Sequence, residues 1–555
     1  MLCQGLKYGV YCEIIAILIF KPMDFNEILN SKQSRIKTAT FIMVVSVLIS
    51  RVLGLLRDRF LAGYFGASID LDIYFTAFRI PDLVYSIIFA GGITVSFLPI
   101  FSEYFKKDKE EAWKVVNYVL NIFFVSYFVF LILFIIFTPQ LISYLAPGFD
   151  VSAQATTVDL TRLVFMSVLF FGMSSVMTAL LNYFNNFLAY SIAPILYNLG
   201  IIFGIIFLSP YFGIFGAGIG VVLGSLLYFL VQIPGAVSNG FRYRPIISFN
   251  HKAIKDFFNM VGPRIISSSS VQFGMAVVTL IASGIGTGAI AVFNLSNNLR
   301  YLPVGVIGIP FATAVFPALS KLWVDENRKE FLNKFRSVFN SVLYFSFPVG
   351  VLIFLLREQI VRIIFQTGSF GSEAVSITAA CLGLYFLSTV AQCLGPIILR
   401  GFFSLKDSKT PTIIALFFVV FNSIACYLSV FYANYFVNIS QMIFGISDLS
   451  QVKVLGLVFA FNLSLFIEFI LLLLLFYRKV GDFGIKVISI YLVKIVLATI
   501  AMSIGIMFVL RFWPSSLSFI YDLAWFCFAC FVAVIVYIVF SYILRIEEVK
   551  KMFRK

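Results

Sequence analysis

Apolar runs long enough to cross a bilayer recur from one end of this chain to the other, separated by short polar connections. A helix needs about 20 apolar residues to cross a hydrocarbon core of about 30 Å. Because only helices and closed barrels satisfy their backbone groups in lipid, the pattern predicts an all-α polytopic membrane protein. About fourteen transmembrane helices are predicted, at residues 37–64, 71–104, 113–138, 156–183, 189–209, 212–237, 256–284, 288–320, 331–356, 373–403, 410–434, 453–477, 486–512 and 518–544.

Two proline-containing landmarks recur at a nearly fixed spacing. The segment FLPIFS around Pro99 returns as VFPALS around Pro317, 218 residues later, and Pro194 corresponds to Pro411, 217 residues later. This spacing indicates two six-helix lobes in parallel repeat around a central cavity, because an even number of helices keeps both copies in the same orientation. We predict an N-terminal cytoplasmic or interfacial segment at 1–35, an N-lobe at 36–240, a C-lobe at 241–480, and two further helices with a basic tail at 481–555.

Composition and charge agree with this reading. The chain is 61% hydrophobic and only 12% charged, whereas soluble domains are about one quarter charged. Its formal net charge of +15 is concentrated in alternate connections, at 106–114, 242–255, 321–336, 406–409, 478–486 and 550–555. The opposite connections at 66–71, 139–157 and 209–213 contain no Lys or Arg. This positive-inside pattern predicts a bacterial inner-membrane protein with both termini cytoplasmic, and it indicates contact with anionic lipid instead of nucleic acid.

The sequence offers no residues for catalysis. It has a single histidine and no HExxH motif, zinc-ligand set, phosphate-binding Walker loop or Ser/His/Asp grouping. We therefore expect a transporter, not an enzyme, with no metal and no cofactor.

Several charged residues fall within predicted spans, where each costs about 2.5–3.5 kcal/mol on insertion scales. Arg51 and Asp58 are seven residues apart and share one face of the first helix, whereas Arg57 points elsewhere unless Gly54 bends the chain. In the second helix, Asp72, Thr76 and Arg79 form another single polar face, and Arg264 does the same in the seventh with Ser268 and Gln272. The eighth helix carries a stripe of Asn294, Asn297, Asn298 and Tyr301, with Arg300 off it.

These groups either pair with one another and with headgroups, or they bind a ligand. The nearby acids Asp58 and Asp72 are outnumbered by four arginines, Arg51, Arg57, Arg79 and Arg264, which leaves excess positive charge facing a predicted interior. Guanidinium groups suit phosphate oxygens because they donate two parallel hydrogen bonds. The pattern therefore predicts a cargo with a phosphate or pyrophosphate head.

The same residues carry a family resemblance. Residues 50–58 (SRVLGLLRD), 77–83 (AFRIPDL), 97–99 (FLP), 316–320 (FPALS) and 400–411 (RGFFSLKDSKTP) resemble the MurJ (MviN) family of lipid-linked-precursor flippases. The resemblance runs from about residue 36 to the end and is strongest in the first two helices.

The resemblance implies membership of the multidrug/oligosaccharidyl-lipid/polysaccharide exporter superfamily. It implies a flippase that moves lipid II, a polyprenyl-pyrophosphate-linked peptidoglycan precursor, to the outer leaflet by alternating access. The last two helices would form a groove for the polyprenyl tail. The expected partners are this glycolipid and membrane lipids, and we expect a monomer. The expected substrate-binding residues are Arg51, Arg57, Asp58, Asp72, Arg79, Arg264, Asn298 and Arg300.

Two departures from the family pattern bear on the cargo. Tyr85 stands where the family usually has an arginine, and Asn297-Asn298 stands where it has an Asp-Arg pair. Arg264 or Arg300 would then substitute for the missing cavity charge. These departures favour one alternative, a flippase for another polyprenyl-linked oligosaccharide. A separate alternative is a non-transporting scaffold that recruits cell-wall enzymes through its cytoplasmic loops.

Overall fold

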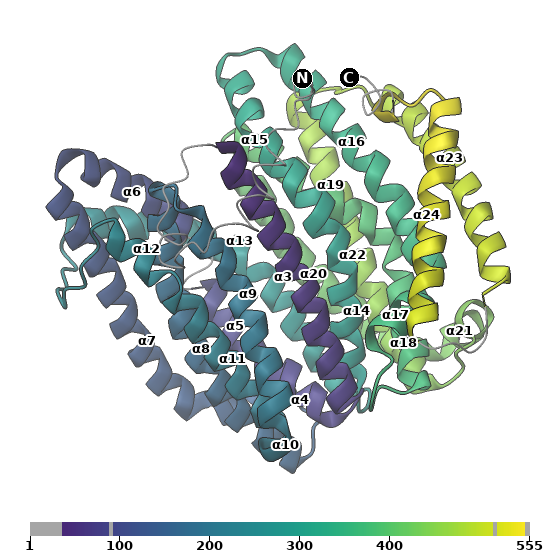
Figure 1. Cartoon of the computed structure of the whole chain (residues 1–555), viewed down its shortest axis with the longest axis horizontal. Coiled ribbons are helices and arrows are strands. Elements are labelled where there is room, and N and C mark those ends of the chain that lie inside the picture. Colours follow the sequence, from purple (N-terminus) through teal and green to yellow (C-terminus); the bar gives the residue numbers. More distant parts are fainter. Residues whose placement is uncertain (1–35, 88–92, 514–518, 550–555) are drawn as a thin grey trace, which may run out of the picture.

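The computed structural model describes residues 36–87, 93–513 and 519–549, without the side chains of 36–44, 93–96, 260–268 and 387. The described residues form helices joined mostly by short connections (Figure 1). Ten of the described helices are long and apolar enough to cross a membrane, or eleven if one bent pair is counted as a single span. The predicted all-α polytopic fold is confirmed, while the predicted segment 1–35 lies outside the described residues.

The remaining predicted spans, the first, second, seventh and tenth, are helices that carry charges or breaks. The first is α3 (Ile36–Phe65), which stays continuous through Gly54. The second is divided into α4 (Ile69–Ala77), α5 (Arg79–Tyr85) and α6 (Ile93–Lys107). The tenth is divided near Tyr385 into α18 (Ser372–Leu384) and α19 (Phe386–Ser404). Breaks of this kind are tolerated at membrane depth only where the backbone is buried in protein or lines a cavity.

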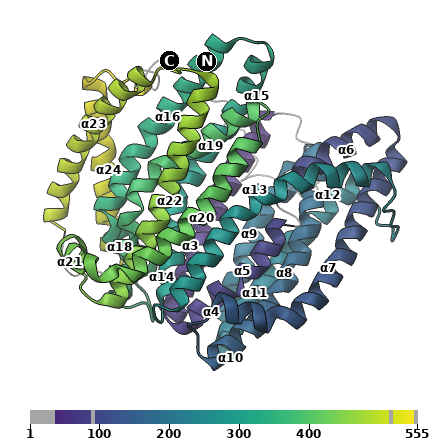
Figure 2. The ribbon, with the colours of Figure 1, turned by 180° about the vertical axis from the view of Figure 1, so that it is seen from behind.

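The helices gather into two bundles (Figures 1 and 2). The first bundle runs from α4 to α12 and includes α7 (Lys109–Leu145), α8 (Val151–Tyr183), α9 (Phe187–Phe203), η2 (Gly204–Leu208), α10 (Ser209–Phe212), α11 (Ile214–Leu230) and α12 (Ile233–Ser238). The second runs from α14 to α24 and includes α14 (Ala289–Pro303), η3 (Val304–Gly308), α15 (Ile309–Val324), α16 (Arg328–Leu355), α17 (Arg357–Phe365), α20 (Lys409–Phe431), η4 (Ala433–Phe436), α21 (Val437–Phe444), α22 (Leu449–Val480), α23 (Ile485–Arg511) and α24 (Phe519–Ile543). The helices α3 and α13 (Lys252–Ser283) contact both bundles.

The buried apolar residues explain how the bundles are joined. One core cluster lies within the first bundle and the start of α13, and another lies within the second bundle and includes α23 and α24. The largest cluster contains residues of both bundles, from Leu61 and Tyr74 to Phe293 and Phe461. The connections α6–α7, α15–α16 and α22–α23, which carry basic clusters, lie at the upper end in Figure 1, here called the basic end. The helices α4, α10 and α21 lie at the opposite end.

Close helix packing sets the position of α9, which lines the site described below. A ridge of small residues on α11, which includes Gly216, Gly220 and Gly224, packs against α9: a Cβ at Gly224 would lie 2.5 Å from the carbonyl oxygen of Tyr197. A Cβ at Gly200 would in turn lie 2.4 Å from Cα of Gly224. Small residues allow such close backbone approach between membrane helices.

Three features extend the second bundle. The predicted pair of C-terminal helices, α23 and α24, packs against α16 and α17, and Tyr537 donates a hydrogen bond of 2.8 Å to the carbonyl oxygen of Tyr344. An ion pair of 3.3 Å joins Arg362 on α17 to Asp522 on α24. The short helices α17 and α21 were not anticipated from the sequence, because each is too short to show a membrane-spanning pattern.

Candidate functional site

A polar cavity of about 550 Å³ lies between α3, α9, α11 and α14. Its charged lining residues all come from α3, and two asparagines of α14 face them. The lining residues are Ser46, Val47, Ser50, Arg51, Gly54, Leu55, Arg57, Asp58, Tyr190, Ser191, Pro194, Asn198, Tyr228, Asn297, Asn298, Tyr301 and Leu302. Of the eight residues expected at the site, the structure places Arg51, Arg57, Asp58 and Asn298 on this cavity.

Asp58 is the centre of a hydrogen-bond network in the cavity wall. Its Oδ1 accepts hydrogen bonds from Arg57 Nε at 3.0 Å and Nη2 at 2.8 Å, and its Oδ2 accepts one from Asn298 Nδ2 at 3.0 Å. Arg57 also donates to Asn198 Oδ1 at 3.3 Å. Asp58 is 3% exposed, so its charge is neutralised by Arg57 instead of water. Arg57 faces the cavity by curling back onto its neighbour, without the bend at Gly54 that the sequence reading required.

Arg51 differs from Arg57 because it has no acidic partner. In the described part of the chain, no carboxylate forms an ion pair with Arg51. Its guanidinium lies over the ring of Tyr301, with Cζ 5.6 Å from the ring centroid. It also lies so close to η3 that a Cβ at Gly305 would come 2.7 Å from Arg51 Nη2. A cation placed over a tyrosine ring and facing a polar cavity leaves its N–H groups available to an anion.

Asp72 is not part of the cavity, contrary to the expectation from sequence. It is 1% exposed and lies at the start of α4, where its carboxylate accepts hydrogen bonds from the backbone N–H groups of Gly288 at 2.6 Å and Ala291 at 2.7 Å. The first N–H groups of a helix have no partner within that helix, so an acceptor from outside stabilises them. Asp72 therefore caps α14 and joins the first bundle to the second.

Arg79 is also placed between the bundles instead of on the cavity. Its Nε donates to Thr279 Oγ1 on α13 at 2.8 Å, and its Nη2 donates to Asn294 Oδ1 on α14. The predicted polar face of Asp72 and Arg79 thus exists, but it faces the neighbouring bundle. The side chain of Arg264 lies outside the described residues.

Arg300 lies behind the cavity wall. It is 5% exposed and donates to Asn297 Oδ1 from Nε at 3.1 Å and from Nη2 at 2.7 Å. Its neighbour Asn297 lines the cavity, whereas Arg300 does not. Sequence reasoning missed Asn198 and gave Asn297 no role at the site. For Asn198 the available signal was a lone asparagine in an apolar span, which is expensive in lipid unless it is buried against polar groups, whereas Asn297 belongs to the polar stripe of the eighth span.

Further contacts join α3 and α13 to the two bundles at the end opposite to the basic end. Ser369 N donates to the carbonyl oxygen of Gly63 at 2.8 Å, and Gly148 N donates to Ser283 Oγ at 3.3 Å. Arg59 Nη1 donates to the carbonyl oxygen of Ile364 at 3.0 Å. Together with Asp72, these contacts form what we call the outer seam.

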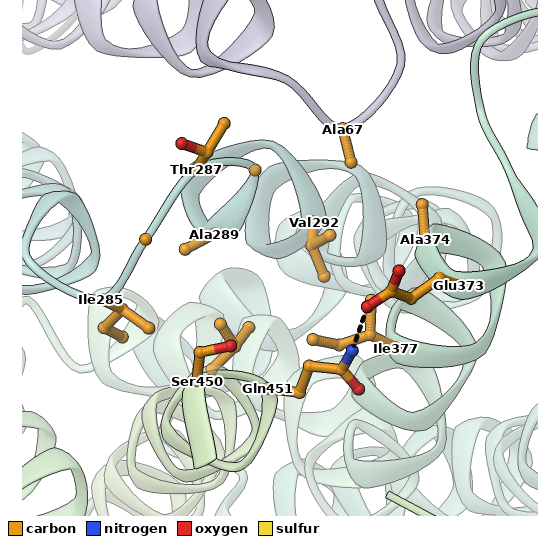
Figure 3. Close-up of a pocket in the computed structure, with 13 residues that line it drawn as sticks. Ala67, Ile285, Thr287, Ala289, Val292, Glu373, Ala374, Ile377, Ser450 and Gln451 are labelled. Atoms are coloured by element: carbon orange, nitrogen blue, oxygen red, sulfur yellow. Dashed lines mark hydrogen bonds between the residues drawn. The ribbon is translucent and has the colours of Figure 1, made fainter. Parts of the chain in front are cut away.

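A smaller pocket of about 220 Å³ lies beside the outer seam (Figure 3). Figure 3 shows Ala67 over the first turn of α14, with Thr287 and Ala289 next to it. Glu373 lies across the pocket and accepts a hydrogen bond of 2.6 Å from Gln451 Nε2. A Cβ at Gly288 would come 2.4 Å from the carbonyl oxygen of Ala67, so the seam is tightly packed at this point.

Comparisons with known proteins agree with this architecture. Two relatives are the probable lipid II flippase MurJ of Buchnera aphidicola subsp. Acyrthosiphon pisum (strain APS) and the lipid II flippase MurJ of Burkholderia cenocepacia. The first is 27% identical over 84% of this chain and 88% of its own length. The second is 26% identical over 69% of this chain and 76% of its own length.

Solved structures extend the comparison. The structure of a lipid II flippase MurJ in an inward closed conformation is 25% identical, with a TM-score of 0.74 over 93% of this chain and 100% of that one. An inward-facing multidrug resistance transporter of the MATE family and the MOP superfamily shares the fold at 14% identity, with a TM-score of 0.66 over 80% of this chain and 98% of that one. The family model described as lipid II flippase MurJ matches residues 61–524, and this chain therefore belongs to the MurJ family.

Proposed function

We propose that this protein is a flippase that moves lipid II from the inner to the outer leaflet by alternating access, with the α3–α14 cavity binding the pyrophosphate. The observation that carries the proposal is the charge in this cavity. Two arginines and one carboxylate line the cavity: Asp58 pairs with Arg57, whereas Arg51 has no acidic partner among the described residues, so one positive charge is left over. A site with surplus guanidinium groups and few carboxylates favours an anion with several oxygens.

The surrounding residues give this site its selectivity. Asn298 and Arg57 hold Asp58 from two sides, so both oxygens of this carboxylate are already hydrogen-bonded. The hydroxyl groups of Ser46, Ser50 and Tyr301 on the cavity wall can bind phosphate or sugar oxygens. The outer seam supports a state in which cargo enters from the basic end, because its hydrogen bonds lie at the opposite end.

The same proposal includes where the protein is located and how it is oriented in the membrane. A multi-pass chain with its basic connections at one end is expected in the inner membrane, with both termini cytoplasmic. The basic end would then face the cytoplasm, where lipid II is made, and the outer seam would face the periplasm. We expect a monomer, because one chain contains a complete cavity.

A second cargo is favoured by the departures at Tyr85 and Asn297-Asn298. The hydroxyl of Tyr85 lies 3.3 Å from Ser175 Oγ, and its ring packs on Phe171, so it adds no charge to the cavity. Asn298 supplies a neutral amide where the family has an arginine. A less positive cavity would suit another polyprenyl-linked oligosaccharide.

Rescue of cells depleted of their own MurJ tests the proposal. The wild-type chain is expected to restore growth, and Arg51→Ala to abolish rescue while accumulating normally in the membrane. Arg328→Ala is the matched control, because Arg328 also lies over an aromatic ring, that of Trp323, but outside the cavity. Normal growth with Arg51→Ala would reject the arginine site. A well-expressed wild-type chain that fails to rescue would favour the other cargo, which a translocation assay comparing lipid II with other polyprenyl-pyrophosphate glycans would then identify.

A further inference from the structure

We propose that Arg300 is a positioning residue of this cavity, which presents the amide N–H groups of Asn297 to the anionic headgroup and adds a positive charge behind them. This inference rests on the proposed function and concerns a pair that the family pattern does not contain. Asn297 lines the cavity, and Arg300, three residues later on α14, lies beneath it in the second bundle.

The hydrogen bonds fix which way the amide points. A guanidinium has donors only, so the amide atom that faces Arg300 must be the oxygen. Two guanidinium nitrogens donate to this Oδ1, at 3.1 Å and 2.7 Å. Nδ2 of Asn297 is then turned away from Arg300, and no residue in the described ranges accepts a hydrogen bond from it. Asn297 thus has two unused donors on the cavity wall.

The adjacent asparagine is used differently. Nδ2 of Asn298 is occupied by Asp58 Oδ2 at 3.0 Å. One amide of the pair therefore holds the carboxylate, and the other remains free to bind cargo. The two neighbouring asparagines therefore have different roles, one toward Asp58 and one toward the cargo.

The charge of Arg300 is not compensated. It is 5% exposed, its Nη1 has no hydrogen-bond partner, and no carboxylate in the described part of the chain forms an ion pair with it. Its guanidinium lies over the rings of Tyr385 and Phe461, with Cζ 5.1 Å and 5.6 Å from their centroids. A buried charge without a counterion is expensive, and its field is weakly screened in a medium of low dielectric constant. The nearby cavity therefore becomes more attractive to an anion.

Binding measurements on the full-length protein in nanodiscs test this inference with two probes, undecaprenyl pyrophosphate and the uncharged undecaprenol. The measured quantity is the ratio of the two affinities, because a general structural defect would weaken both. Asn297→Asp would place a carboxylate oxygen on the cavity and neutralise Arg300. Arg300→Met would remove the charge and release the amide. Each variant is expected to lower the ratio about tenfold, since hydrogen bonds to charged groups contribute about 1.5–3 kcal/mol.

Asn333→Asp is the matched control. Asn333 Oδ1 accepts a hydrogen bond of 3.0 Å from Arg336 Nη2 with the same sequence spacing, but this pair is exposed and outside the cavity. The ratio of the two affinities in Asn333→Asp should equal that of the wild type. An unchanged ratio in both Asn297→Asp and Arg300→Met, with a lowered ratio in Arg51→Ala, would overturn the role of Arg300 and leave the proposed function standing. A wild-type ratio near one would instead reject the proposed function itself.

Discussion

The carboxylate of Asp72 accepts a hydrogen bond of 2.6 Å from the backbone N–H of Gly288, across the boundary between the two helix bundles. A second bond, of 2.7 Å, comes from Ala291 N, so one side chain of α4 caps the first turn of α14. A negative charge at a helix N-terminus is stabilised by the unpaired N–H groups and by the helix dipole. The bundles must lose these bonds if they separate at this end, and Asp72 therefore stabilises the closed outer seam.

Removal of Asp72 is expected to open the outer seam more often. Loss of a capping side chain costs about 1–2 kcal/mol, so Asp72→Ala should raise the open population about tenfold, and Asp72→Asn should have a smaller effect. The check is the rate at which a membrane-impermeant thiol reagent modifies Ala289→Cys, a position that is 4% exposed in the closed seam. The native cysteines would be replaced in the background protein.

Asp70→Ala is the control for this experiment. Asp70 lies in the same first turn of α4 but is exposed, so its removal should leave the modification rate unchanged. Equal rates in the wild type, Asp70→Ala and Asp72→Ala would show that Asp72 does not hold the seam.

A methyl group at Gly305 is expected to displace Arg51. The added Cβ would lie 2.7 Å from Arg51 Nη2 and 3.0 Å from Cζ, which forces the guanidinium away from Tyr301. Gly305→Ala should therefore weaken binding of undecaprenyl pyrophosphate about tenfold, as loss of a hydrogen bond to a charged group would. The fold should persist, because alanine is better than glycine in a helix by about 0.5–1 kcal/mol.

Gly395→Ala separates these two effects. Its Cβ would meet no described atom within 4 Å, so this variant should keep wild-type affinity and unfold at the same or a higher temperature. Wild-type affinity in Gly305→Ala would show that Arg51 does not need its observed position.

Acid is expected to weaken one contact at the basic end. Partial burial alone would raise the pKa of Asp407, but hydrogen bonds from Lys479 and Thr410 outweigh it and hold that pKa below its ordinary value. A carboxyl with a lowered pKa in the folded state stabilises the protein above the unfolded pKa of about 3.9, and this contribution is lost as the pH falls through the folded pKa. Asp407→Asn should thus lower the unfolding temperature at pH 7, with the difference from wild type shrinking below about pH 4.

The effect should be small. The Lys479 side chain is 45% exposed, so screening limits the ion pair to about 1 kcal/mol or less. Glu103→Gln is the control, because its ion pair with Lys107 is exposed and should not change the unfolding temperature. A pH-independent difference between wild type and Asp407→Asn would contradict the assigned ionisation.

The charged residues show how much of the site could be predicted from the sequence. The seven-residue spacing of Arg51 and Asp58 on a straight helix was sufficient to predict that both face one cavity. The same periodicity correctly grouped Asp72 with Arg79, yet it could not say which neighbour that face meets. Both side chains form hydrogen bonds with the first turns of α14, and Arg79 also forms one with α13. Helical periodicity defines a direction on one element, whereas the partner depends on how the bundles pack.

The way in which Arg57 reaches the cavity, and the position of Arg300, were not predicted for a related reason. Arg57 lies off the Arg51 face, but its long side chain folds back to Asp58 and Asn198. Arg300 has the charge expected of a ligand-binding residue, but it is buried behind Asn297. A flexible arginine extends far from its Cα, so its location depends on the nearest acceptor in space.

Apolar runs, the placement of basic connections and the repeated proline segments were by themselves sufficient to predict an all-helical membrane protein, because the cost of exposing polar groups to lipid constrains every span separately. The limits of the two repeats and the orientation of the termini stay predictions. Tertiary packing alone decided that Asp72 caps a helix, that Asn198 and Asn298 complete the Arg57–Asp58 network, and that Asn297 faces the cavity. The residues that those hydrogen bonds join lie up to 240 positions apart in the chain. A periodic pattern within one helix cannot show that they meet, because their contact depends on how the helices pack.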